Sequence, residues 1–295
     1  MLALAPPSER SVRDAAALLV DHAGAESNTC VGLARLGLRV AWISRLGADA
    51  AGDRILDALG AEGVDTQWVE RDPIRRTGLM LKEPGAPVRY YRSDSAASIM
   101  GPAVLPIEAI ARARAVLVTG VTALIGEEPH AAGLALLEHA SGLRVVDPNL
   151  RMGLWGSDRR AALVRPFLER SDLLLTGIAE LVEILGAGRG GAAGQEHEAS
   201  EEIARATAKL GPREVVVRSA STVGALADGV WHQLDIRREA AVDPIGAGDA
   251  FNAGYIAVRL RGGAIEDALQ DGVRCGTAVT TAISDTSAFP RRLQP

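Results

Sequence analysis

The residues best suited to chemistry lie in one short stretch, Gly246-Ala247-Gly248-Asp249. Glycines let a turn bring backbone N–H groups close to a ligand, and the small residues that follow, as far as Leu260, predict a tightly packed helix. The first N–H groups of a helix have no internal partner and carry partial positive charge, so the turn predicts an anion site. Asp249 would lie in the first helical turn, beside the anion.

The local pattern leaves two roles open for Asp249. A carboxylate repels a bound phosphate, so it is better explained as a general base for a hydroxyl group that attacks the phosphate. Alternatively, it is an ordinary first-turn aspartate that interacts favourably with the helix dipole.

The composition describes an ordinary globular protein, because 47% of the 295 residues are hydrophobic and 23% are charged. The net charge of −5 argues against nucleic acid or an anionic membrane as a partner. The N-terminus lacks a signal-peptide pattern and no apolar run approaches the ~20 residues of a membrane span, so we expect a cytoplasmic protein. Lys82 and Lys209 are the only lysines, which excludes the Gly-Lys pair of a P-loop. Cys30 and Cys275 form no metal-type pair and are expected to be buried free thiols.

Helical and strand patterns alternate along most of the chain, which predicts a parallel sheet covered by helices. Helices are expected at 25–37, 50–62, 247–260 and 264–283, and buried strands at 39–44, 115–119, 143–147, 172–176 and 214–218. Residues 186–202 are glycine-rich and then acidic, which predicts a loop. The G-x-G-x-x-G in this loop follows a helix, so it lacks the context of a dinucleotide fingerprint.

Short alternating segments between residues 66 and 92 predict a small β insertion that projects from the α/β body. Tyr90 and Arg92 would share one face of its last strand, although they could also be an ordinary exposed pair. We expect one face of the insertion to cover a ligand or a partner subunit. The predicted division is a body of residues 1–63 and 96–295 and a lid of residues 64–95, with Met1–Pro6 as a segment that could associate with the lid.

Further polar clusters lie at helix starts and strand ends. Asn28 could bind a polyol hydroxyl, or could simply cap the first helix. Arg151 follows the strand at 143–147, at the edge where open α/β sheets bind ligands, unless it is a solvated arginine after a Pro-Asn turn. The segment Arg218-Ser219 to Gly224 follows another strand and could lie against a nucleotide.

Together these motifs resemble the ribokinase-like sugar kinases of the phosphofructokinase-B type. Asp243–Phe251 has the pattern D-x-x-G-A-G-D-A-F of the second family signature, and Gly24–Gly37 resembles the first. The resemblance runs from about residue 20 to about residue 290. Thr77–Met80, Tyr90–Ser98 and Asp147–Arg151 resemble 2-keto-3-deoxygluconate kinases in particular. The family implies an α/β three-layer sandwich with a mainly parallel central sheet and a small β lid.

The resemblance also implies an activity, which is the ATP-dependent phosphorylation of the terminal hydroxyl of a sugar acid. The favoured substrate is 2-keto-3-deoxygluconate, which would become its 6-phosphate. Asp249 would take the hydroxyl proton, and the N–H groups of Gly246, Ala247 and Gly248 would stabilise charge on the phosphoryl oxygens. Mg²⁺ would bridge the phosphates of ATP. The lid would exclude water and, as lids of this family often do, pair with a second subunit in a homo-oligomer.

The implied binding residues form three sets. The sugar acid would contact Gly24, Asn28, Tyr90, Arg92 and Arg151, of which the two arginines suit a carboxylate. The nucleotide would contact Arg218, Ser219, Gly224, Gly246 and Gly248. Glu180 and Asp243 would act indirectly on the metal.

The chain departs from the family pattern in three places. The family begins with a strand that ends in Gly-Glu, before the equivalent of Met1–Pro6. Its absence suggests a start assigned too far downstream or a truncation, and predicts exposed sheet edges. Gly177 replaces an asparagine linked to magnesium and phosphate, although Glu180 is kept, and Ala23 replaces the first glycine of a pair. Two alternatives stay open. One is a kinase of a neutral sugar of the fructose or ribose type, and the other is a catalytically impaired sugar-binding member, which the missing strand and Gly177 suggest.

Overall fold

The computed structural model describes residues 1–7, 11–83, 85–150, 156–186, 196–236, 244–282 and 284–291. Two of the predicted site residues, Arg151 and Asp243, lie outside the described residues. Within the described ranges, no helix combines the length and the apolar character that crossing a membrane requires.

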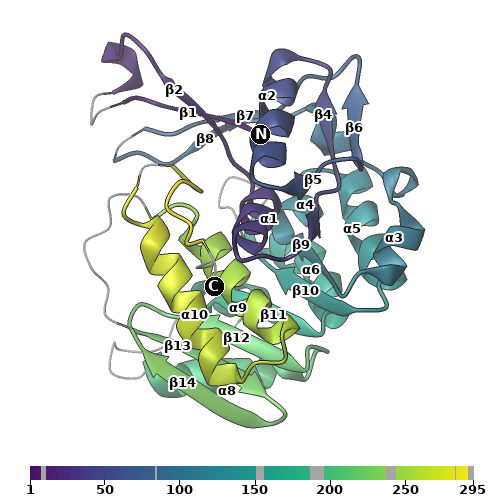
Figure 1. Cartoon of the computed structure of the whole chain (residues 1–295). Helices are drawn as coiled ribbons and strands as arrows, with labels where there is room; N and C mark the ends of the chain where they lie inside the picture. The colour runs from purple at the N-terminus through teal and green to yellow at the C-terminus, as the bar shows by residue number, and fades with distance from the viewer. Residues whose placement is uncertain are drawn as a thin grey trace.

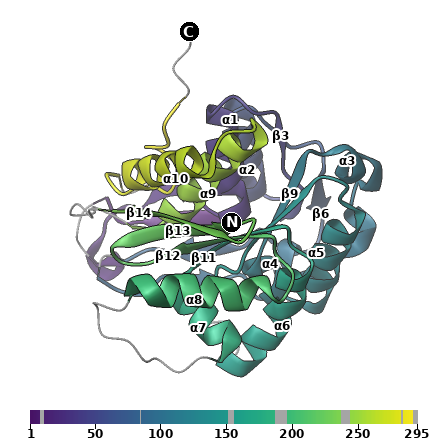
Figure 2. The same ribbon diagram turned by 90° about the horizontal axis from the view of Figure 1, so that it is seen from below.

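The body is a three-layer α/β sandwich around a six-stranded sheet of order β14-β13-β12-β11-β10-β9 (Figures 1 and 2). Four strands are parallel: β9 (Ala115–Thr119), β10 (Leu143–Asp147), β11 (Leu173–Gly177) and β12 (Glu214–Arg218). Two strands that the sequence analysis did not identify, β13 (Thr222–Ala227) and β14 (Val230–Asp235), extend the sheet antiparallel. The prediction of a mainly parallel central sheet is confirmed.

Helices cover both faces of this sheet (Figure 2). One face carries α1 (Ala25–Arg35), α9 (Ala247–Leu260) and α10 (Ile265–Val279), and the other carries α5 (Glu127–His139), α6 (Ser157–Glu169), α7 (Ile178–Leu185) and α8 (Glu196–Ala208). Successive strand residues therefore enter different cores: Leu173 and Leu175 pack with α9 and α10, and Leu174 packs with the other layer. The start of α8 corrects one prediction, because the acidic part of the expected loop, from Glu196 onward, is helical.

The remaining short elements connect these layers. They are α2 (Ala50–Ala61), α3 (Ile107–Arg112), α4 (Gly120–Leu124) and the 3₁₀ turns η1 (Val12–Asp14), η2 (Ala96–Ile99) and η3 (Pro102–Val104).

The region that follows α1 is assembled from pairs of short strands. β3 (Val40–Ala41) pairs with β5 (Val64–Asp65), and β4 (Ser44–Gly47) pairs with β6 (Val69–Asp72). The prediction of one strand over 39–44 is therefore wrong. Trp42 and Ile43 separate β3 from β4, and they pack into different hydrophobic clusters, so the chain bends between them.

A separate four-stranded sheet, which we call the lid, has the order β2-β1-β7-β8 (Figure 1, top left). Its strands are β1 (Leu2–Ala5), β2 (Leu19–His22), β7 (Leu79–Leu81) and β8 (Arg89–Tyr91). Met1–Pro6 thus lies with the lid strands. In contrast, β5 and β6 lie in the predicted lid segment 64–95 but pair with β3 and β4.

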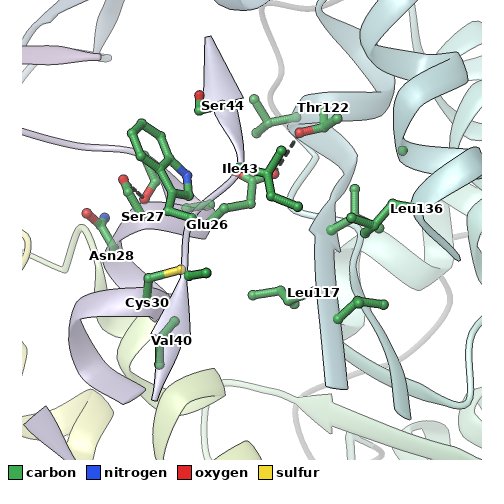
Figure 3. A pocket seen from close by; sticks show the side chains of 18 of the residues that line it. Glu26, Ser27, Asn28, Cys30, Val40, Ile43, Ser44, Leu117, Thr122 and Leu136 are labelled. Carbon is green, nitrogen blue, oxygen red and sulfur yellow. Dashed lines mark hydrogen bonds between the residues drawn. The ribbon is translucent and has the colours of Figure 1, made fainter. Parts of the chain in front are cut away.

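A gap in the strand pairing separates β3 from β9. Among the described strands, β9 pairs with β10 alone and β3 pairs with β5 alone. A cavity of about 740 Å³ extends from beneath the lid into this gap. Figure 3 shows Cys30 and Val40 on one side of it and Leu117 and Leu136 on the other. Among the described strands, β9 is thus the edge strand of the six-stranded sheet.

Candidate active site

The glycine-rich turn starts α9 at the predicted place, with Gly246 as the residue before the helix. Gly246 has φ +87°, and an added Cβ atom would lie 2.6 Å from the carbonyl oxygen of Asp285, so conformation and packing both require glycine. The N–H of Ala247 donates to Pro244 O at 3.3 Å. At Gly248 an added Cβ would meet nothing closer than 3.7 Å, so the protein itself leaves room there for a ligand.

Asp249 lies in the first turn of α9 and is only 6% exposed. Its Oδ2 accepts a 2.8 Å hydrogen bond from Asn28 Nδ2, and both residues line the cavity. The buried Oδ1 of Asn28 has no hydrogen-bond partner among the described residues. A buried acceptor without a partner is costly, so Asn28 is suited to receive a hydrogen bond from a ligand hydroxyl.

The lid contributes an aromatic and a cationic side chain to the same cavity. Tyr90 and Arg92 both line it, and the guanidinium carbon of Arg92 lies 4.4 Å from the centre of the Tyr90 ring. This stacking orients the guanidinium group, and the Arg92 side chain is buried. Gly24 lines the cavity from the start of α1. The structure therefore brings together Gly24, Asn28, Tyr90 and Arg92, four of the five residues predicted to bind the sugar acid.

On the other side of the turn, Arg218 connects the end of β12 with α9. Its Nη1 donates to Asn252 Oδ1 at 2.7 Å and to Gly248 O at 3.3 Å, and its Nη2 lies 3.7 Å from Asp147 Oδ2. Asn252 in turn donates to Asp147 Oδ2 at 2.6 Å. The carboxyl ends of β10 and β12 and the N-terminus of α9 thus meet at one polar network, at the sheet edge where α/β proteins bind ligands.

The other predicted nucleotide residues have local structural partners. Ser219 Oγ accepts the N–H of Thr222 at 3.0 Å and shapes the turn between β12 and β13. Gly224 makes room for Trp231, because an added Cβ would lie 2.1 Å from the indole ring. Contact of Ser219 or Gly224 with a nucleotide stays a prediction.

Both carboxylate oxygens of Glu180 accept hydrogen bonds. Oε1 accepts from Leu150 N at 2.7 Å, and Oε2 accepts from Gly177 N at 2.8 Å and from Thr176 Oγ1 at 3.0 Å. Burial, and next the negative charge of Asp147, raise the pKa of Glu180. The described residues contain no cluster of three potential metal ligands.

The sequence analysis missed three charged residues that border the cavity or its network. Glu26 Oε1 accepts from Thr119 Oγ1 at 2.7 Å and from Thr122 Oγ1 at 2.8 Å, and so joins α1 to the end of β9 (Figure 3). Lys82 and Asp285 form a buried ion pair. The sequence could have pointed to Lys82, since lysine is rare in this protein and Lys82 lies two residues after Met80, on the same face of the strand. Nothing in the sequence marked Asp285.

The cysteines match their prediction, because both are free and buried. Burial raises the pKa of Cys30 to about 12, which leaves its thiol protonated and unreactive although it borders the cavity.

Known proteins are similar to this chain in both sequence and fold. It matches the pfkB family carbohydrate kinases over residues 1–292. The 2-dehydro-3-deoxygluconokinase of Bacillus subtilis is 32% identical over 279 residues, which cover 92% of this chain and 84% of that protein. A fructokinase of Klebsiella pneumoniae is 30% identical over 287 residues, covering 92% and 90%. The crystal structure of 2-dehydro-3-deoxygluconokinase from Thermotoga maritima superimposes with a TM-score of 0.89 at 25% identity, covering 98% of this chain and 94% of that one.

The match spans nearly the whole chain, and both family signatures lie at one cavity, with Asn28 and Asp249 in contact. The chain therefore belongs to the pfkB family and is a carbohydrate kinase.

Proposed function

We propose that this kinase transfers the γ-phosphoryl group of ATP to the terminal hydroxyl of 2-keto-3-deoxygluconate, which is also named 2-dehydro-3-deoxygluconate. The observation that carries the proposal is Arg92, a buried arginine in the cavity that holds Asn28 and Asp249. A guanidinium matches a carboxylate in bidentate geometry, whereas a neutral sugar offers it no charge. The named relatives from Bacillus and Thermotoga support the same substrate class.

In the proposed reaction, Asp249 removes the proton from the attacking hydroxyl. Asn28 holds one carboxylate oxygen at 2.8 Å and thereby orients the base. The N-terminus of α9, with the N–H groups of Gly246, Ala247 and Gly248, stabilises charge that develops on the phosphoryl oxygens. Mg²⁺ bound with ATP neutralises phosphate charge. Glu180 and Asp243 are proposed to act on it only indirectly.

A panel of sugars assayed with ATP and Mg²⁺ tests this assignment. We expect the highest kcat/KM with 2-keto-3-deoxygluconate, and much lower values with fructose and ribose. A preference for fructose would support the alternative of a neutral-ketose kinase, which the Klebsiella relative favours. If none of these sugars led to ATP consumption, the result would favour a sugar-binding member that lacks this activity.

The lid offers a surface for the proposed homo-oligomer. Strand alternation and register place Leu2, Leu4, Val20, Leu79, Leu81 and Tyr91 on its outer face, opposite Ala3, Met80 and Tyr90. Met80 and Tyr90 line the cavity. Val20 is 39% and Tyr91 50% exposed, although both are large and apolar. We infer that a second copy covers this face. Light scattering should show a dimer or a larger assembly that Val20→Glu dissociates, and a monomeric wild-type protein would contradict the inference.

A further inference from the structure

Two side chains of the lid reach the C-terminal segment at Ser284 and Asp285. The ammonium group of Lys82 forms a buried ion pair with the Asp285 carboxylate. Asp21 of β2 accepts a 2.6 Å hydrogen bond from Ser284 Oγ. The N–H of Lys82 donates to Leu4 O at 2.8 Å, which continues the pairing of β7 with β1 and turns the side chain toward the body. The lid is thus attached to the body at two neighbouring residues.

Asp285 in turn contacts the residues around the catalytic base. Its Oδ2 accepts from Asn28 Nδ2 at 3.3 Å, and the same nitrogen donates to Asp249 Oδ2 at 2.8 Å. The backbone oxygen of Asp285 packs against Gly246. Exposure is 8% for Lys82, 3% for Asp285, 2% for Asn28 and 6% for Asp249. A continuous chain of buried polar contacts therefore runs from the lid to the base.

The charges along this series of contacts explain why the lid contact matters for Asp249. Asp249 and Asp285 both accept hydrogen bonds from the side-chain amide of Asn28. Two carboxylates this close repel each other in a buried site. The cation of Lys82 offsets that repulsion and keeps Asp285 in place. Arg92, Glu26 and the Met1 amino group are the other charged groups of this neighbourhood, and the Met1 amino group interacts electrostatically with Arg92, Glu26 and Asp285.

We propose that Lys82 is a positioning residue for Asp249, acting through Asp285 and Asn28. Closure of the lid places the ammonium group on Asp285, and this contact fixes Asn28 and Asp249 in the geometry needed for proton removal. The base is then fully assembled only beneath a closed lid, which limits ATP consumption when no sugar is bound. The catalytic part of this inference rests on the proposed function, whereas the lid contact does not.

Lysine labelling tests the contact without any substrate, because the chain contains two lysines and Lys209 is exposed. We treat the protein with an amine-selective acetylating reagent and follow each lysine by peptide mass spectrometry. We expect Lys82 to react at least about 10-fold more slowly than Lys209, since a hydrogen-bonded charge pair protects it. Asp285→Asn should bring its rate toward that of Lys209. Equal rates for the two lysines in the wild type, or an unchanged slow rate of Lys82 in Asp285→Asn, would overturn the proposed lid contact even if a sugar is phosphorylated.

Kinetics test the positioning role. Lys82→Met should lower kcat by about 10-fold to 100-fold and leave the KM for ATP little changed, because a misplaced base slows the chemical step. Lys82→Arg should restore part of the loss, and Lys209→Met is the matched control without effect. Lys82→Met/Asp285→Asn should be no slower than the slower single variant, since both act on one path. An unchanged kcat in Lys82→Met, or strictly additive losses, would contradict the proposal.

Discussion

The two sides of the kinase body are built on different plans. From β9 to β14 the strands form one sheet with a core on each face, and Leu173, Leu174 and Leu175 of β11 have no exposed surface. Around α2, in contrast, the strands are short: β3 has 2 residues and β4 has 4, each with a single partner. We call the first region the sheet side and the second the paired-strand side. The cavity lies between them and is covered by the lid.

This difference separates two tasks. The sheet side holds the glycine-rich turn before α9 and Arg218, whose positions depend on strands packed on both faces. The lid carries Tyr90 and Arg92, and polar contacts of Lys82 with Asp285 and of Asp21 with Ser284 tie it to the body. A rigid support suits electrostatic stabilisation of a transition state, and a loosely attached cover suits substrate entry and closure. Asn28 and Asp249 meet where the two sides join.

The largest difference should appear in stability. Leu174→Ala removes a fully buried side chain from the sheet side and should cost about 2–5 kcal/mol of unfolding free energy. Leu117→Ala lies on β9, where the side chain already borders the cavity, so it should cost only about 1 kcal/mol. Urea unfolding of both variants measures this. Equal costs would show that β9, beside the cavity, is packed as tightly as β11 in the middle of the sheet.

Changes on the lid should affect binding rather than stability. Arg92→Met should raise the KM for 2-keto-3-deoxygluconate by about 10-fold to 100-fold, because a charge-assisted hydrogen bond contributes roughly 1.5–3 kcal/mol. Turnover of fructose, where measurable, should change little. Arg89→Met is the matched control, since Arg89 is exposed on β8, the strand that directly precedes Arg92. If Arg92→Met weakened both sugars equally, the carboxylate assignment would be wrong.

A smaller stability effect is expected on the paired-strand side. Asp49 caps α2 through Gly52 N and also accepts from Thr77 N, both at 2.8 Å. Burial acts to raise the pKa of Asp49, but these hydrogen bonds outweigh it and hold the pKa below the ordinary 3.8. Asp49→Ala should therefore cost about 0.5–2 kcal/mol. The exposed Asp57→Ala on the same helix is the control.

The pH dependence of that cost follows from its sign. A depressed folded-state pKa stabilises the protein above the unfolded pKa of about 4, and this contribution is lost as the pH falls further. Thermal unfolding at pH 7 and pH 3 should show the wild type and Asp49→Ala converging at the lower pH. A constant difference would mean that the carboxylate charge contributes nothing.

The same difference between the two sides explains which parts of the fold and the site could be predicted from the sequence. On the sheet side, buried strands read as continuous apolar runs and the α9 turn depends on local glycines, so β9 to β12 and Asp249 were predictable. On the paired-strand side, β3 and β4 are set by which core accepts Trp42 and Ile43, which is a tertiary choice. Likewise, Asp285 gains its place only through contacts with Lys82 and Asn28, which lie far away in the sequence.

The central claim is that Asp249 is the base for transfer of phosphate from ATP to a sugar acid. The most direct test is kcat with ATP, Mg²⁺ and 2-keto-3-deoxygluconate for the wild type and for Asp249→Asn, which keeps the size of the side chain. The account predicts that the variant folds with unchanged stability and that its kcat is lower by about 10²–10⁴. Equal rates for the two proteins would contradict it.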